Sequence, residues 1–116
     1  MPFMLYNGDE YHGIARNENH DVYKWVGGVD CTILFSITQL GNVVSSHFAS
    51  DKNGLRHIKP AIKEFCEFVF NACEWCEMIT ANIGFPSVIR IVEKCGFKYL
   101  GTVQKLDVYA LERGDK

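Results

Sequence analysis

The chain has 116 residues, of which 47% are hydrophobic and 22% charged, and its formal net charge is -2. This length suits one domain, and a domain of this size buries roughly two-thirds of its unfolded surface, so it can fold without disulfides or a structural metal. The 12 basic and 14 acidic residues are spread along the chain, which excludes the basic block of a nucleic-acid-binding protein and an acidic solvating tail.

Residues 1–6 lack the charged segment and the apolar run that open a secretory signal peptide. No stretch approaches the roughly 18 apolar residues of a membrane span. The five cysteines are odd in number, and several lie where helix or strand is predicted, which differs from a secreted disulfide scaffold. We therefore expect a soluble protein of the reducing cytoplasm, with no membrane or nucleic-acid partner.

Residues 1–30 are the least legible segment, because glycines interrupt short stretches of mixed polarity. Within it, residues 21–26 suit either a strand or a single helical turn. Residues 31–38 and 43–49 are rich in β-branched and aromatic side chains, and a Gly-Asn turn signal lies between them. These two runs predict an antiparallel hairpin.

A turn-rich loop at residues 50–54 leads into a predicted helix, whose apolar residues recur every three or four positions. Pro60 conflicts with a regular helix from residue 55, because proline costs about 3 kcal/mol in a helix interior and is tolerated in a first turn. Either the regular helix begins near Lys59, or the residues before it form an irregular turn. The predicted buried stripe consists of Leu55, Ile58, Ile62, Phe65, Val69 and Ala72.

The rest of the chain predicts a strand, a short helix and two further strands. Residues 78–83 form the strand, Pro86 suits the first helical position, and Gly96 suits a left-handed residue after the helix. Residues 97–112 predict two strands that meet near residues 104–105. The order strand, strand, helix, strand, helix, strand, strand predicts an α/β domain with a mixed sheet and helices on its faces.

The stretch from Val88 to Gly101, with Glu-Lys-Cys-Gly-Phe at its centre, resembles the fourth helix and following strand of the GNAT (GCN5-related N-acetyltransferase) fold. Asn82, at a strand end, is similar to the asparagine that GNAT proteins place near the pantetheine arm of the coenzyme. Residues 106–112 resemble the family's last strand. The resemblance covers residues 31–112.

This resemblance implies one GNAT-like α/β domain over residues 1–116, with its core at residues 31–112 and its N-terminal helices truncated. It implies acetyl-CoA as the co-substrate, an unidentified amine as the acceptor, and no metal. The run from His47 to Asp51, continued by Phe65, also resembles small GNAT-like proteins of bacteriophage virions and head assembly. That subgroup implies the cytoplasm of a bacterial host.

Three features depart from the GNAT pattern. The family's pyrophosphate loop, Gln/Arg-x-x-Gly-x-Gly/Ala, matches cleanly only at Gly54, and Val92 stands where many members carry the tyrosine that protonates the leaving thiolate. The segment before the hairpin is also short for the two helices that flank the acceptor site. These departures leave three functions open: an acetyltransferase, a catalytically degenerate GNAT-like protein of phage head assembly, and an acyl-CoA sensor.

The candidate coenzyme site follows the second strand of the hairpin. The resemblance implies that backbone amides near its end bind the thioester oxygen, and the amides at the next helix N-terminus can hold a pyrophosphate. Asp51 opposes phosphate binding by repulsion, and the loop can equally be a plain connection. The predicted coenzyme-binding residues are Phe48, Ala49, Lys52, Asn53, Gly54, Leu55, Arg56 and Asn82.

Three side chains are candidates for acid–base chemistry, and two of them, His47 and Tyr109, are the predicted catalytic residues. His47 is one, because an unperturbed histidine titrates near neutrality, although a histidine on a half-buried strand more often has a structural role. Tyr109 is the other, in place of the missing helix tyrosine, although packing of its ring against a helix is the commoner role. Glu77 is expected to lie on the surface at the start of a strand.

Cys73 and Cys76 have the spacing Cys-x-x-Cys, which occurs in zinc and redox sites. Since a single pair with no histidine at ligand spacing makes a poor metal site, we expect buried structural thiols. Phe68 and Phe70 flank the core stripe, so one is expected under the sheet and the other partly exposed. An exposed aromatic residue in the set Phe65, Phe68, Phe70 and Trp75 would support a protein partner or a homodimer.

Overall fold

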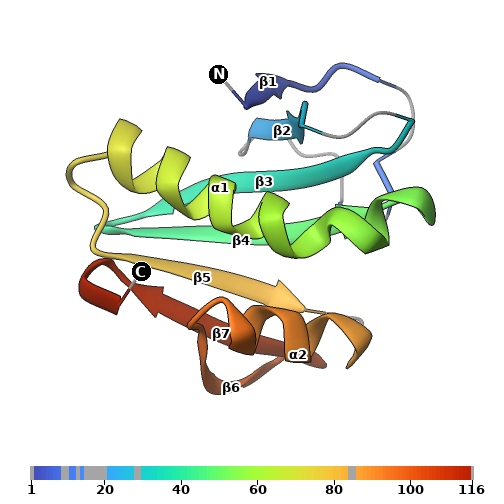
Figure 1. Cartoon of the computed structure of the whole chain (residues 1–116). Coiled ribbons are helices and arrows are strands. Elements are labelled where there is room, and N and C mark those ends of the chain that lie inside the picture. The colour runs from blue at the N-terminus through green and yellow to red at the C-terminus, as the bar shows by residue number, and fades with distance from the viewer. Residues whose placement is uncertain are drawn as a thin grey trace.

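The structure is a computed structural model, and it describes residues 2–8, 11–12, 14, 21–27, 30–83 and 86–115. In this part of the chain, the strands and α-helices from residue 31 onward follow the order that the sequence predicts (Figure 1). The elements are β1 (Phe3–Leu5), β2 (Asp21–Trp25), β3 (Ile33–Leu40), β4 (Val43–Ser50), the 3-10 helix η1 (Asn53–His57), α1 (Ile58–Ala72), β5 (Met78–Ile83), α2 (Pro86–Lys94), β6 (Lys98–Val103), β7 (Leu106–Glu112) and the 3-10 helix η2 (Arg113–Asp115).

The strands form one mixed sheet in the order β1-β2-β3-β4-β5-β7-β6. β3 and β4 are the predicted antiparallel hairpin, and Gly41 at its turn has φ +64°, which glycine adopts without strain. β4 pairs with β5 in parallel, and β5 pairs with β7 antiparallel. The prediction of a mixed α/β sheet is confirmed.

Both helices lie on the same face of this sheet, whereas the sequence predicted helices on its faces in general (Figure 1). Buried residues of α1 and α2 belong to one core together with residues of β3, β4, β5 and β7. Phe65 of α1 stacks on Phe35 of β3, with ring centroids 4.4 Å apart. A smaller cluster on the opposite face joins Val22, Leu34 and Ala49.

The conflict at Pro60 is resolved by a change of helix type. The 3-10 helix η1 ends at His57, α1 begins at Ile58, and Pro60 therefore lies in the first turn, where its missing N–H has no helical partner to lose. The predicted stripe is wrong at its two ends. Leu55 is 49% exposed because a 3-10 helix has three residues per turn and rotates it off the stripe. Ala72 is exposed because the stripe continues from Val69 to Cys73.

The predicted ends of α2 and the last hairpin are confirmed. Pro86 is the first residue of α2, and Gly96 has φ +98°. The amides of Gly96 and Phe97 donate to the carbonyls of Glu93 and Val92, which is the Schellman pattern of a helix C-terminus. Gln104 and the residue after it both have positive φ, as a two-residue hairpin turn requires.

The secondary structure of residues 1–30 was hard to predict because the strands there are short and mixed in composition. Residues 21–25 form a strand, which settles the alternative between strand and helical turn, and β1 pairs antiparallel with it. Residues 1, 9–10, 13, 15–20 and 28–29 of this segment lie outside the described residues. Phe70 is buried and Phe68 half-buried, as predicted for the residues flanking the stripe. None of the helices in the described ranges has the length and apolar character needed to cross a membrane.

Candidate functional site

β4 runs past the end of its pairing with β5. The parallel register begins at Val43↔Met78 and ends at His47↔Asn82, and no later residue of β4 has a β5 partner within the described residues. The His47 amide donates to Ser36 Oγ on β3 at 2.8 Å, so alternation along the strand turns the Phe48 carbonyl toward the β5 side. The backbone groups of Phe48 therefore face the β5 side beyond the last β4–β5 pair, while β4 itself stays paired with β3.

A cavity of about 140 Å³ lies at this end of β4. It is bounded by the last residues of the strand, by η1 with the start of α1, and by the first turn of α2. Since both helices begin here, the positive ends of their dipoles face the same region. Three predicted coenzyme residues line the cavity together with four that the sequence did not indicate; the full lining is Phe48, Ala49, Ser50, Leu55, Ile58, Ser87 and Val88.

The loop predicted to hold a pyrophosphate is closed by its own carboxylate. Asp51 Oδ1 accepts from the Gly54 amide at 2.8 Å, and Asp51 Oδ2 accepts from the Thr32 amide at 3.0 Å. The amide of Gly54 is thus occupied, and an incoming phosphate would have to displace Asp51. A Cβ on Gly54 would lie 2.3 Å from Ser50 Oγ, so close packing already requires glycine here.

The other predicted residues of this loop lie outside the cavity lining. Lys52 and Arg56 are exposed, one before η1 and one within it. Asn53 Nδ2 donates to the Asp30 carbonyl at 3.3 Å, which ties the loop to the chain preceding β3. Of residues 52–56, only Leu55 lines the cavity, and the side chains of Lys52 and Arg56 are exposed outside its lining.

Asn82 connects the two parallel strands at their last paired residues. Its Nδ2 donates to Ser45 Oγ at 3.0 Å and to the Ser46 carbonyl at 3.2 Å, both on β4. The side chain therefore holds β4 against β5 at the point where β4 continues alone. It is not among the residues that line the cavity.

His47 and Tyr109 lie on opposite faces of the sheet. His47 pairs with Asn82, which pairs with Val108 of β7, whereas Tyr109 pairs with Ala81 in the neighbouring row. Successive residues of a strand point to opposite faces, so only Tyr109 shares the face that the helices cover. The two predicted acid–base candidates are therefore placed on different sides of the strands.

Tyr109 is nearly buried, with 7% of its surface exposed. Burial raises the pKa of its phenol, and the carboxylates of Glu93 and Asp107 raise this pKa further. The ring of Tyr99 packs edge-on at 5.4 Å between centroids. A phenol with a raised pKa stays protonated at neutral pH, which suits a proton donor. Val92, at the position of the family's helix tyrosine, is fully buried in the core.

Ser46 is a buried polar residue near the cavity, though not part of its lining, that the sequence did not indicate. Its side chain is fully buried, and its Oγ has no hydrogen-bond partner within the described residues. A buried hydroxyl without a partner costs about 1–3 kcal/mol. Ser46 lies two residues before Phe48 on the same face of β4, adjacent in register to Ala81 and through it to Tyr109. Its serine was visible in the strand sequence, but only the fold shows that it is buried.

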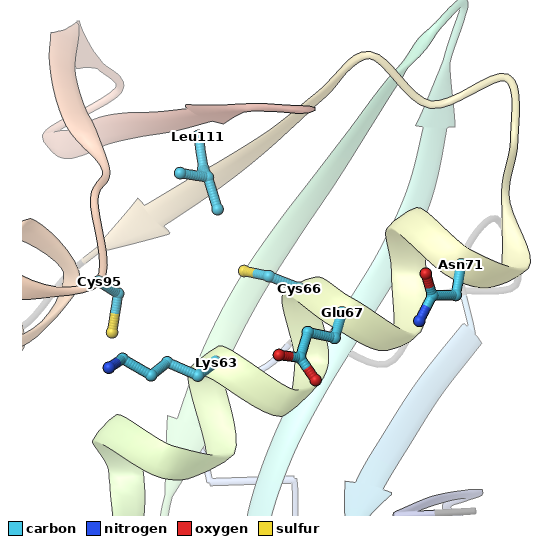
Figure 2. Close-up of a pocket in the computed structure, with 6 residues that line it drawn as sticks. All are labelled: Lys63, Cys66, Glu67, Asn71, Cys95 and Leu111. Atoms are coloured by element: carbon cyan, nitrogen blue, oxygen red, sulfur yellow. The ribbon is translucent and has the colours of Figure 1, made fainter. Parts of the chain in front are cut away.

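A larger cavity, of about 420 Å³, lies between α1, the end of α2 and β7 (Figure 2). Burial raises the pKa of the Cys95 thiol there, and the neighbouring Lys63 and Lys59 act in the opposite direction. Among the described residues, its lining comes from α1, the residue after α2 and β7, and it includes none of the predicted site residues. We assign the candidate site to the smaller cavity for that reason. The larger one is lined by Lys63, Cys66, Glu67, Asn71, Cys95 and Leu111.

Comparison with solved structures finds this fold in acetyltransferases. A chimera of the spermidine N-acetyltransferase SpeG from Vibrio cholerae and hSSAT matches with a TM-score of 0.66 and 10% identity, over 84% of this chain and 69% of that one. A Bacillus subtilis acetyltransferase in complex with CoA gives 0.64 and 12%, over 82% and 78% of the two chains. The aminoglycoside acetyltransferase AAC(6')-Ib in complex with coenzyme A gives 0.64 and 18%, over 84% and 69%.

These matches show that the chain has the GNAT acetyltransferase fold, so the resemblance inferred from its sequence is confirmed. Neither the protein-family models nor the curated protein sequences give a match. At identities of 10–18% the likeness establishes the fold alone. The bacteriophage subgroup stays a prediction.

Proposed function

We propose that the protein binds acetyl-CoA at the end of β4 and transfers the acetyl group to an amine. The observation that carries this proposal is the cavity between the end of β4, η1 and the first turn of α2. It lies where β4 continues beyond its pairing with β5. Two structures with the same fold, the Bacillus subtilis enzyme and AAC(6')-Ib, are complexes with coenzyme A, which supports the choice of ligand.

The reaction needs an amine nitrogen to attack the thioester carbonyl, forming a C–N bond as the C–S bond breaks. The Phe48 amide, which points to the β5 side of β4 like the Phe48 carbonyl, would stabilise the oxyanion that develops on the carbonyl oxygen, whereas the predicted amide of Ala49 points toward β3. Fixed donors of this kind supply much of the catalysis in acyl transfer. Tyr109, on the helix-covered face, would give its proton to the departing thiolate. His47, on the other face, would take the proton that the amine loses.

Titration of the protein with acetyl-CoA in a calorimeter tests the binding step. Micromolar affinity supports the proposal, because it requires a built site for the coenzyme. The absence of binding at millimolar acetyl-CoA would remove both the enzyme and the acyl-CoA sensor. In that case the remaining function is the catalytically degenerate protein, for which the occupied Gly54 amide and the buried Val92 are the specific supporting observations.

Asp51→Asn is expected to bind acetyl-CoA about tenfold more tightly at low ionic strength, since it removes a charge that competes with the phosphates for the Gly54 amide. The same change is expected to cost about 1–2 kcal/mol of stability. An asparagine has one side-chain oxygen instead of two, so its NH₂ group would face the Thr32 amide and leave that amide without an acceptor. Calorimetry and denaturant unfolding measure the two effects. Glu77→Gln is the matched control, because it removes one exposed carboxylate outside the cavity. Equal affinity in the two variants would exclude a phosphate at Gly54.

Tyr109→Phe is expected to lower kcat at least about tenfold with little change in KM for acetyl-CoA, because the phenol would act only as the thiolate leaves. The raised pKa of Tyr109 sets the sign of the pH effect. The acid is active while protonated, so the wild-type rate should not fall as pH rises to about 10, the ordinary tyrosine value. Steady-state rates measured across that range check both points.

Tyr99→Phe provides the control for Tyr109, since it removes only the hydroxyl of the neighbouring ring. The Tyr99 side chain is 56% exposed. Its hydroxyl pairs with Thr102 Oγ1 at 2.8 Å on the surface. Turnover should be unchanged in this variant. If Tyr109→Phe also keeps its full turnover while coenzyme binding is intact, Tyr109 is not the acid.

A further inference from the structure

Cys73 and Cys76 stand at the two ends of the turn that joins α1 to β5. The Cys76 amide donates to the Cys73 carbonyl at 2.9 Å, which closes a four-residue turn. A turn of this kind keeps its end Cα atoms within about 7 Å. A disulfide needs Cα atoms roughly 4.4–6.8 Å apart, so the backbone already holds the two cysteines at a compatible separation.

The two thiols differ in their access to solvent. Cys73 is half-buried, whereas Cys76 is fully buried and its Sγ donates to the Met78 carbonyl at 3.3 Å. Burial is the main cause that raises the pKa of the Cys76 thiol, and the nearby Cys73 also raises it. Cys73 can therefore meet a reagent first, with Cys76 next to it on the inner side.

Arg113, the first residue of η2, fixes this turn in place. Its guanidinium donates to the carbonyls of Cys73 at 2.8 Å and Cys76 at 2.8 Å, and further bonds reach Phe70 and Glu74. All four acceptors are backbone oxygens. Bond formation between the two sulfur atoms would therefore leave the contacts that hold the turn intact.

We propose that Cys73 and Cys76 form a reversible dithiol–disulfide site that reacts with low-molecular-weight disulfides. The thiolate of Cys73 attacks the disulfide RS–SR, forms a mixed disulfide and releases one RS⁻. The thiolate of Cys76 then attacks the Cys73 sulfur, closes the intramolecular S–S bond and releases the second RS⁻. The two cysteine thiols are oxidised, one disulfide is reduced to two thiols, and the thiol protons pass to the released thiolates or to water.

Only the two thiols take part in the proposed exchange. Within the described ranges, no group of three or more His, Cys, Asp or Glu side chains is placed to hold an ion. The turn precedes Met78, the first residue of β5, while the candidate coenzyme cavity lies beyond the other end of that strand. At about 3.3 Å per residue the two sites are roughly 17 Å apart, so the redox site is independent of the proposed acetyl transfer.

Incubation of the reduced protein with oxidised glutathione tests the proposal. The chain should lose two of its five thiols without gaining glutathione mass, and peptide mapping should place the new bond between Cys73 and Cys76. A reducing dithiol should restore all five. Retention of all five thiols at oxidant concentrations that oxidise a free dithiol peptide of the same turn sequence would overturn the proposal. A bond mapped between Cys66 and Cys95 would overturn it as well.

Two cysteine variants sharpen the result. Cys73→Ser should form no intramolecular disulfide, and circular dichroism should show the native fold because Cys73 is only half-buried. Cys95→Ser, which changes a half-buried thiol away from the turn, should still lose two thiols under the same conditions. Loss of the disulfide in Cys95→Ser but not in Cys73→Ser would contradict the assignment. If Cys73→Ser fails to fold, the mapped bond of the wild-type chain decides alone.

Discussion

Arg113→Ala is expected to lower the free energy of unfolding by about 2–4 kcal/mol, the largest effect we expect from any single polar side chain of this protein. Arg113 Nε and its two Nη atoms donate to four backbone carbonyls, at distances of 2.8–3.3 Å. Its guanidinium also lies 4.9 Å from the centroid of the Phe70 ring. Denaturant unfolding followed by circular dichroism measures the loss.

The cost is large because of where the four carbonyls lie. Phe70 is in the last turn of α1, whose final carbonyls have no helical partner, and the remaining acceptors belong to the turn into β5. A cation at a helix C-terminus also interacts favourably with the helix dipole. Removing the guanidinium takes the charged donor away from all four oxygens, and it removes the side-chain contacts between η2 and the end of α1.

Arg113→Lys and Arg90→Ala are the controls for this prediction. Lysine keeps the charge but offers a single ammonium group in place of the planar fork, so we expect an intermediate loss. Arg90 is exposed on α2, and its removal should change stability by less than about 0.5 kcal/mol. A loss in Arg113→Ala no greater than that of Arg90→Ala would show that the four bonds contribute little.

Much of the fold was predictable because its elements are long and periodic. Residues 78–83 alternate in burial along β5, and α1 shows the helical spacing of apolar side chains, so these elements were predicted nearly to the residue. Gly41 and Gly96 were also predictable, because a turn or a helix end with positive φ depends on the residue at that position. β1, with three residues, is too short to show a period, and its pairing with β2 depends on contacts distant in sequence.

The candidate site was only partly predictable, for a different physical reason. The GNAT resemblance indicated Phe48 and Ala49 at the end of the second hairpin strand, and both line the cavity, while their role toward a coenzyme stays a prediction. Asp51 was interpreted only as a charge that repels phosphate. An Asp three residues before a helical amide is also typical of side-chain capping, and that pattern would have indicated the bond to Gly54. Arg113 gave no signal, since its partners lie 37–43 residues away in sequence.

Ser87→Trp is expected to weaken acetyl-CoA binding by about 30-fold or more, which corresponds to ~2 kcal/mol. Ser87 is the second residue of α2, is exposed, and lines the cavity of about 140 Å³. An indole is of the same order of size as this cavity, so it would occupy the space that the proposed coenzyme needs. Because the serine is exposed in the first turn of the helix, the fold should tolerate the larger side chain. Calorimetric titration with acetyl-CoA gives the affinity, and thermal unfolding checks the fold.

Two substitutions separate filling of the cavity from an effect of the new residue itself. Ser87→Ala removes the hydroxyl without adding volume, and its affinity should match that of the wild type. Lys94→Trp adds the same indole at an exposed position on the same helix, about two turns or 10 Å away, where it should leave binding unchanged. If Ser87→Trp binds acetyl-CoA as tightly as Lys94→Trp, the coenzyme does not occupy this cavity. The larger cavity beside Cys95 would then be the next place to seek it.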